Sequence, residues 1–251
     1  MTMQTELRHD LPNGTALRGA EARRHEAYAF FSAARMRAAF PMPEAAWRSF
    51  AQLWDNLTLD RHMGDGGLYR FRRYGAFEMS TPEAALRLLP HAAYAQPSYI
   101  NALNGDMERW FDPLEPAFVN HLFLHRLLHT LGHMFDDARG RTGPWNIRLH
   151  PYRIRARAGV AGQPTPEGLH RDGVDYIVTM MVARHNVRGG TTIVADSNGN
   201  TLFEHRLEQP MEMLVADDAM CMHAVTAVDC IDPNAESYRD VLVVAFTAID
   251  L

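Results

Sequence analysis

The spacing of apolar residues changes near residue 145, from a helical period before it to an alternating period after it. The segment that begins at Ala20 is rich in Ala, Arg and Glu, which favour helix, and it ends before Pro41. A proline at a tolerated first-turn position opens the next helix, and Gly140 ends a longer one. The pattern therefore predicts helices at Ala20–Phe40, Pro43–Trp54 and Pro113–Phe135, and a strand at Tyr69–Phe77.

Beyond residue 145 the chain reads as many short strands separated by turns. No helix there is long enough to cross between parallel neighbours, so antiparallel packing of two sheets, a jelly roll, is expected. The fold class is α+β in one domain, with 1–144 a mainly helical support region and 145–251 the sheet core. The predicted strands are 145–156, 169–183, 191–195, 201–206, 212–216, 220–224 and 238–249, with a turn at Asn186–Gly190 and a hairpin at Asn198-Gly199.

Composition fits one core and excludes several classes of protein. The chain has 251 residues, 47% of them hydrophobic, and a formal charge of -5, which gives no general attraction to nucleic acid or to anionic membranes. No apolar run is long enough to span a membrane, and with two cysteines outside any metal or redox spacing a cytoplasmic location is expected. All 25 basic side chains are arginine, so lysine Schiff-base and P-loop chemistry are excluded.

Four histidines recur at every fourth residue of the predicted third helix, which is a spacing that places metal ligands on one helical face. They spread over about 120° and centre well away from the leucine-rich side of that helix. No carboxylate or cysteine at ligand spacing joins them. We therefore interpret His121, His125, His129 and His133 as a solvated or interface face and not as a native metal site.

A second constellation is more informative. His170 and Asp172 are two apart, so on a strand they point the same way, and His223 follows some fifty residues later. Two imidazoles and one carboxylate form the facial triad of non-haem Fe(II) oxygenases, which leaves three coordination positions open. Arg239 stands where a polar segment becomes a buried apolar strand, and an arginine there can bind a carboxylate through two parallel hydrogen bonds.

The order and flanks of these residues resemble the 2-oxoglutarate-dependent Fe(II) oxygenases, and within them the bacterial L-isoleucine dioxygenase-like hydroxylases of free amino acids. The likeness is strong over roughly residues 145–250 and weaker before. It rests on Pro164–Gly173 (PTPEGLHRDG), Arg184–Gly190 (RHNVRGG) and Tyr238–Thr247 (YRDVLVVAFT), and more weakly on Tyr69–Gly75 (YRFRRYG) and Asn101–Gly105 (NALNG).

This resemblance implies the double-stranded β-helix form of the jelly roll, as in cupins, with Fe(II) held by His170, Asp172 and His223. It implies 2-oxoglutarate, held by Arg239, and O2 as co-substrates, with succinate and CO2 as co-products of hydroxylation at an unactivated C–H bond. Related halogenases carry a small residue in place of the carboxylate, so Asp172 favours hydroxylation.

The substrate is expected to be a free amino acid or a similar small polar metabolite, bound by a monomer or homodimer. Arg153, Arg72 and Arg73 are the candidates for its carboxylate, although ion pairs at the rim of the sheet explain each one equally well. Asp175 is near in sequence and faces the site only if a bulge displaces it. Two alternatives remain: a cupin-like metalloprotein without a keto acid, and an oxygenase that tailors a larger or carrier-bound substrate.

Overall fold

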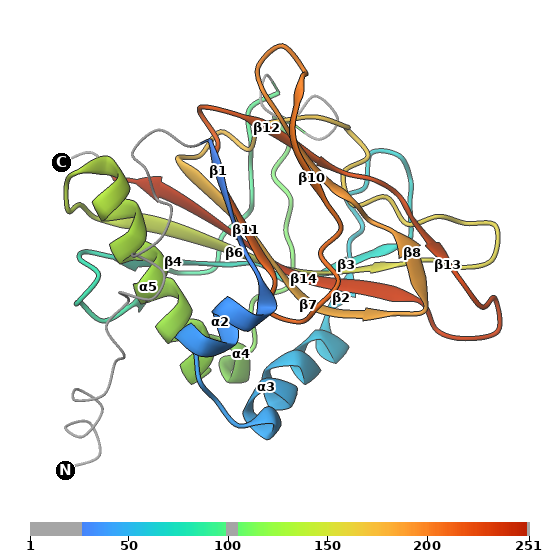
Figure 1. Ribbon diagram of the computed structural model, residues 1–251, viewed down its shortest axis with the longest axis horizontal. Coiled ribbons are helices and arrows are strands. Elements are labelled where there is room, and N and C mark those ends of the chain that lie inside the picture. Colours follow the sequence, from blue (N-terminus) through green and yellow to red (C-terminus); the bar gives the residue numbers. More distant parts are fainter. Residues whose placement is uncertain (1–26, 99–104, 250–251) are drawn as a thin grey trace.

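The computed structural model describes residues 27–98 and 105–249, and its largest element is a sheet of nine described strands (Figure 1). The strand order is β1-β11-β7-β14-β6-β3-β2, with β4 also paired to β6 and β5 paired to β4. Every pairing is antiparallel, as predicted. The strands are β1 (Tyr28–Phe31), β2 (Thr58–Leu59), β3 (Arg70–Arg72), β4 (Gly75–Met79), β5 (Arg87–Leu88), β6 (Trp145–Arg155), β7 (Tyr176–His185), β11 (Met213–Asp217) and β14 (Tyr238–Ala248).

Two smaller sheets lie beside the large one. One has the order β10-β9-β12 and the other pairs β13 with β8, both antiparallel. Val194 on the first small sheet packs with Ile177 and Ala245 of the large sheet, so an apolar layer joins the two. The strands are β8 (Val187–Gly189), β9 (Thr192–Ala195), β10 (Thr201–His205), β12 (Met222–Val225) and β13 (Val228–Cys230).

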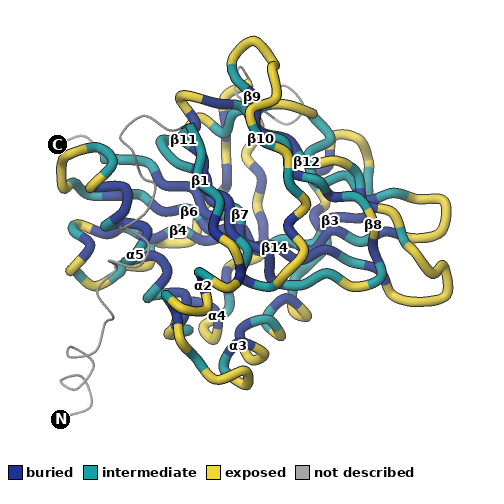
Figure 2. The backbone as a smooth tube through the Cα atoms, in the orientation of Figure 1, coloured by how far each residue is buried: buried dark blue, intermediate teal, exposed yellow. Residues whose placement is uncertain are grey.

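The helices cover the opposite face of the large sheet (Figure 1). Alternate residues of β14, such as Leu242 and Val244, face the helices and belong to one buried cluster with Phe50 and Leu124. Figure 2 shows this buried layer running along the central strands. The helices are α2 (Ala33–Ala39), α3 (Glu44–Ala51), the 3-10 helix η1 (Gln52–Asn56), α4 (Pro116–Val119) and α5 (Leu122–Arg139).

The first predicted helix is wrong over part of its length. Of Ala20–Phe40, residues 20–26 lie outside the described residues, and Tyr28–Phe31 forms β1, paired with β11. Ser32 then begins α2, its side chain accepting a hydrogen bond from the backbone N–H of Arg35. The missed signal was the aromatic run in Tyr28–Phe31 followed by Ser32. Aromatic residues favour strands, and here they pack at the edge of the sheet.

The other two predicted helices form at the predicted positions, but each is divided into two shorter elements. Pro43–Trp54 is α3 followed by the 3-10 turn. Pro113–Phe135 is divided at Asn120, and His121 caps the start of α5 by accepting from the Phe123 N–H. Gly140 ends α5 in the left-handed region at φ 68°, as predicted.

Most strand predictions are confirmed to within two or three residues. Two exceptions matter: Tyr69–Phe77 is broken into β3 and β4, and the strand predicted at 169–183 begins only at Tyr176. The Asn198-Gly199 hairpin forms between β9 and β10, with positive φ at Gly199 alone.

The protein is thus mostly sheet with few helices. Within its described residues, the region 1–144 contributes five short strands, β1 to β5, to the large sheet in addition to the helices. Among the helices of the described part, none combines the length and apolar character that a bilayer crossing requires.

Candidate metal centre and its pocket

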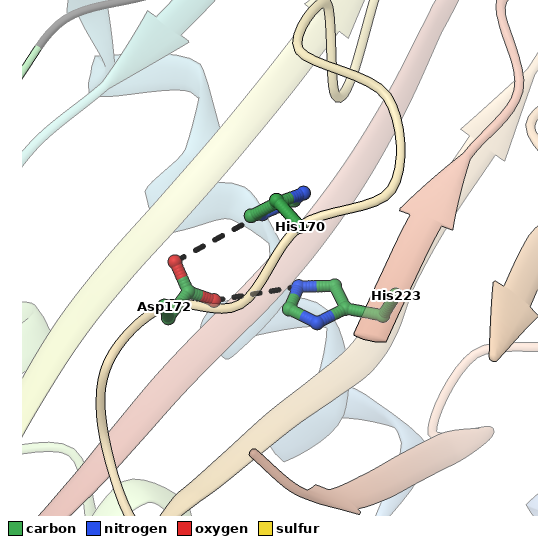
Figure 3. A group of neighbouring side chains, drawn as sticks. All are labelled: His170, Asp172 and His223. Carbon is green, nitrogen blue, oxygen red and sulfur yellow. Dashed lines mark ion pairs between the residues drawn. The ribbon is translucent and has the colours of Figure 1, made fainter. Parts of the chain in front are cut away.

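His170, Asp172 and His223 converge on one point. The two oxygens of Asp172 point to different imidazoles, with Oδ1 4.0 Å from Nε2 of His170 and Oδ2 3.3 Å from Nε2 of His223 (Figure 3). One ligand atom from each residue lies within 4.8 Å of the others. It is the single such group that could hold a metal among the described residues.

The backbone that presents these ligands is not the regular strand that the sequence predicted. His170 forms an isolated bridge to His223, with backbone hydrogen bonds of 3.1 and 2.9 Å, and Asp172 lies in the loop before β7. Gly173 turns that loop at φ 72°. The two side chains therefore converge because of the bridge and the turn, and not because of strand alternation.

The side chain of Asp218 holds this loop in place. Its carboxylate is 2% exposed and accepts the backbone N–H groups of Asp172, Gly173 and Val174 at 3.0, 2.7 and 3.1 Å. Three hydrogen bonds to one carboxylate hold the loop in place and satisfy three consecutive backbone donors. Asp218 is a positioning residue for Asp172.

The protonation states suit a divalent cation. Burial alone would raise the pKa of Asp172, but its hydrogen bond to His223 and the charges of both imidazoles hold that pKa below the ordinary value, so the carboxylate is ionised. Nδ1 of His170 lies 2.9 Å from the carbonyl oxygen of Gly168 and donates to it, which leaves Nε2 as the ligand atom. The donor set fits Fe(II).

A pocket that is partly open to solvent is lined by all three candidate ligands. Arg239 on β14 lines it with an exposed fraction of only 1%, and its Nε and Nη2 atoms have no hydrogen-bond partner. Burial, with the nearby charge of Arg184, lowers the pKa of Arg239 to about 9. Asp240 does not pair with it, because consecutive strand residues face opposite ways and Asp240 bonds Arg153.

The pocket also contains residues that the sequence patterns did not single out. Tyr94 and Arg109 lie outside the named helices and strands and are joined by an isolated β-bridge. Gln96 donates to the backbone carbonyl of Asp172 at 3.3 Å. Of the family-like segment Asn101–Gly105, residues 101–104 lie outside the described residues. Tyr152, Ile154, Val225, Val241 and Glu167 also line the pocket.

Of the predicted substrate residues, Arg72 lines the pocket and three others do not. Arg153 donates twice to Asp240 at 2.8 Å and once to Asp55 at 2.9 Å, on the helix-covered face of the sheet. Arg73 donates to the carbonyls of Asn56 and Pro113. Both arginines are therefore structural, and their prediction as substrate residues is corrected.

Asp175 likewise has a structural contact. Its Oδ2 accepts the backbone N–H of Ala248 at 2.7 Å, and its Oδ1 lies 3.8 Å from Arg139. The bulge that would turn it into the pocket does not occur, so its place among the site residues is corrected.

The helix histidines hold backbone atoms of other segments. Nε2 of His125 contacts the carbonyl of Val119 at 2.8 Å, and Nδ1 of His129 contacts that of Pro82 at 2.8 Å. The interface interpretation fits these contacts, and the described residues contain no metal-binding group there.

Comparison with known proteins agrees with this geometry. The family described as 2OG-Fe dioxygenase matches residues 51–245. A solved structure of a bsmA homologue from Methylobium petroleophilum is 37% identical, covers 90% of each chain and has a TM-score of 0.81. IDO from Bacillus thuringiensis (18% identity, 89% of this chain and 95% of that one, TM-score 0.75) and the Fe(II)/α-ketoglutarate-dependent dioxygenase TqaL (17%, 89% and 83%, 0.64) share the fold. No curated protein gives a significant match.

Proposed function

Because this chain belongs to the 2OG-Fe dioxygenase family and is an Fe(II)- and 2-oxoglutarate-dependent dioxygenase, we propose that it hydroxylates a free amino acid or a similar small polar metabolite. One oxygen atom of O2 enters the substrate C–H bond to give an alcohol. The other enters the carboxylate of succinate, formed as 2-oxoglutarate loses CO2. In this proposal the sheets form a double-stranded β-helix, and 1–251 is one oxygenase domain.

The ligands in this proposal are His170, Asp172 and His223. Bound Fe(II) supplies the activation of O2 and its coupling to oxidation of the keto acid. The protein's own contribution is to hold the three donors on one side, with the imidazole of His170 oriented by Gly168 and the carboxylate of Asp172 oriented through the loop that Asp218 fixes.

The observation that carries the proposal is the state of Arg239. A guanidinium that is 1% exposed, with two nitrogens lacking partners, is costly unless an anion completes it. A carboxylate matches its planar fork, and the distal carboxylate of 2-oxoglutarate is the ligand we assign. A cupin-like protein without a keto acid leaves this buried cation unexplained.

The pocket supports a small substrate that is polar at one end. Arginine, tyrosine and glutamine side chains line it together with the three candidate metal ligands and several aliphatic side chains. Ile154, Val225 and Val241 line the pocket and provide an apolar wall for an aliphatic or thioether side chain.

The test is a screen of the free amino acids with protein loaded anaerobically with Fe(II) and 2-oxoglutarate and then given O2. We expect one group of amino acids to yield a product one oxygen heavier and an equal amount of succinate. Succinate without any oxidised amino acid would reject the substrate class, and oxidation that does not require 2-oxoglutarate would reject the reaction.

A further inference from the structure

Arg72 is a buried cation in an aromatic cage on the pocket wall. Its exposed fraction is 1%, and its guanidinium carbon lies 3.7 Å from the ring centre of Phe111 and 4.6 Å from that of Tyr152. One nitrogen donates to Nδ1 of His150, whose pKa is held well below its ordinary value by burial and by the arginine, so this imidazole is a neutral acceptor. Nε of Arg72 has no hydrogen-bond partner.

Arg109 is a second buried cation on the pocket wall. It is 2% exposed, lies over the ring of Tyr94 at 4.9 Å and donates to the side-chain oxygen of Gln96 at 3.0 Å. Its Nε atom also lacks a hydrogen-bond partner. Both arginines line the pocket that contains the three metal ligands.

Among the described residues, these two charges are at most partly balanced by carboxylates. Within the described residues the only carboxylate near either guanidinium is Asp60, 4.0 Å from Arg72, and that carboxylate forms its close ion pair with Arg70 at 2.7 Å. A buried cation without a close carboxylate is unfavourable, and contacts with aromatic faces offset only part of that cost. The wall is therefore built to receive an anion.

We propose that Arg72 and Arg109 form a carboxylate subsite that binds the substrate, distinct from the site at Arg239. This inference rests on the proposed function, since the ligand is taken to be the substrate of the oxygenase. It narrows that function to substrates with a free carboxylate, and it excludes an amino acid held as a carrier thioester or within a peptide chain, where that carboxylate is consumed.

The sheet register separates the two cationic sites. Arg72 and Val241 both pair with Tyr152, so β3 and β14 flank β6, and the strands that carry Arg72 and Arg239 lie about 10 Å apart. The charged neighbours also differ, since Arg184 and Asp240 act on Arg239 whereas Arg70 and Asp60 act on Arg72. A keto acid bound at Arg239 leaves the Arg72 side of the pocket for the second molecule, whose apolar part then contacts Ile154.

The experiment measures binding without turnover. The anaerobic Fe(II)·2-oxoglutarate form is titrated by calorimetry with L-leucine, L-isoleucine and L-methionine, with their carboxamides, and with hexanoate and hexylamine. The variants are Arg72→Gln and Arg109→Gln, each checked for folding by circular dichroism, and Arg73→Gln is the control because Arg73 bonds backbone carbonyls away from the pocket. If Arg72→Gln fails to fold, Arg109→Gln decides.

We expect at least one acid to bind wild type about 10- to 100-fold more tightly than its amide, which is the value of a charged hydrogen bond. Arg72→Gln and Arg109→Gln should each remove most of that preference, while Arg73→Gln and the affinity for 2-oxoglutarate stay unchanged. Acids that bind no better than amides, or a lost affinity for 2-oxoglutarate in these variants, overturn the subsite.

Hexanoate separates the two levels of the proposal. If hexanoate binds and Arg109→Gln weakens it, but no amino acid binds, the subsite stands and the amino-acid substrate fails. If neither hexanoate nor any amino acid binds wild type, the subsite itself is wrong.

Discussion

The substitution Arg239→Met tests two effects of this buried cation, its destabilisation of the apoprotein and its contribution to the binding of 2-oxoglutarate. In the protein without co-substrate, Nε and Nη2 of Arg239 are buried and unpaired, and each such group costs about 1–3 kcal/mol. Met keeps a long side chain but removes the charge. Allowing for imperfect packing, Arg239→Met should stabilise the apoprotein by about 2 kcal/mol, which raises the unfolding midpoint by about 4–8 °C in a chain of this size.

The same substitution should abolish tight binding of the co-substrate. Two charge-assisted hydrogen bonds of about 1.5 kcal/mol or more each amount to at least about 3 kcal/mol, or roughly 100-fold in affinity. Arg239→Lys keeps the charge but loses the planar fork, so it should show an intermediate affinity. The measurements are thermal unfolding of the apoprotein by circular dichroism and anaerobic calorimetry with 2-oxoglutarate.

Arg153→Met is the matched comparison, because Arg153 is also buried but is paired. It donates twice to Asp240, and burial, which would lower its pKa, is outweighed by the carboxylates that raise it. Its loss leaves Asp240 buried without a counter-ion and should destabilise the protein by about 3–5 kcal/mol. If Arg239→Met also lowers the midpoint, or leaves 2-oxoglutarate binding intact, the reasoning about the unpaired cation is refuted.

Further predictions concern the metal centre and the corrected residues. His170→Ala and His223→Ala should each abolish Fe(II) binding in an anaerobic titration, while His125→Ala should not; iron loss confined to the helix variant would reject the assignment. Asp218→Ala should weaken the binding of Fe(II) about 10- to 100-fold because it releases the loop, and Asp218→Asn should bind with an affinity between those of wild type and Asp218→Ala. Iron affinities equal to that of wild type in the two variants would contradict a positioning role. Arg153→Met should leave the affinities for iron and 2-oxoglutarate unchanged.

The three candidate metal ligands could be identified from the sequence, although the predicted reason for their convergence was wrong. His170 and Asp172 were placed on a strand, but they meet through a bridge to His223 and a turn at Gly173. The prediction relied on the types and order of the residues. The backbone conformation around Asp172 depends on hydrogen bonds to Asp218, which lies far away in sequence.

The substrate side of the pocket could not be predicted in the same way. Alternation along β6 places Arg153 on one face and Tyr152 with Ile154 on the other, but the sequence does not indicate which face meets the pocket. That choice depends on the helices, which cover the Arg153 face. Arg109 and Tyr94 lie on an irregular segment without hydrophobic periodicity, so no pattern marked them.

The most direct test of the central claim is isotopic. Protein loaded with Fe(II) and 2-oxoglutarate is given 18O2 and an amino acid that the screen identifies, and both products are read by mass spectrometry. The account predicts one labelled oxygen in succinate and one in the hydroxylated amino acid, in equal amounts, with neither formed by the His223→Ala variant. Labelled succinate with an amino acid that has gained no oxygen, or products formed equally by that variant, would contradict it.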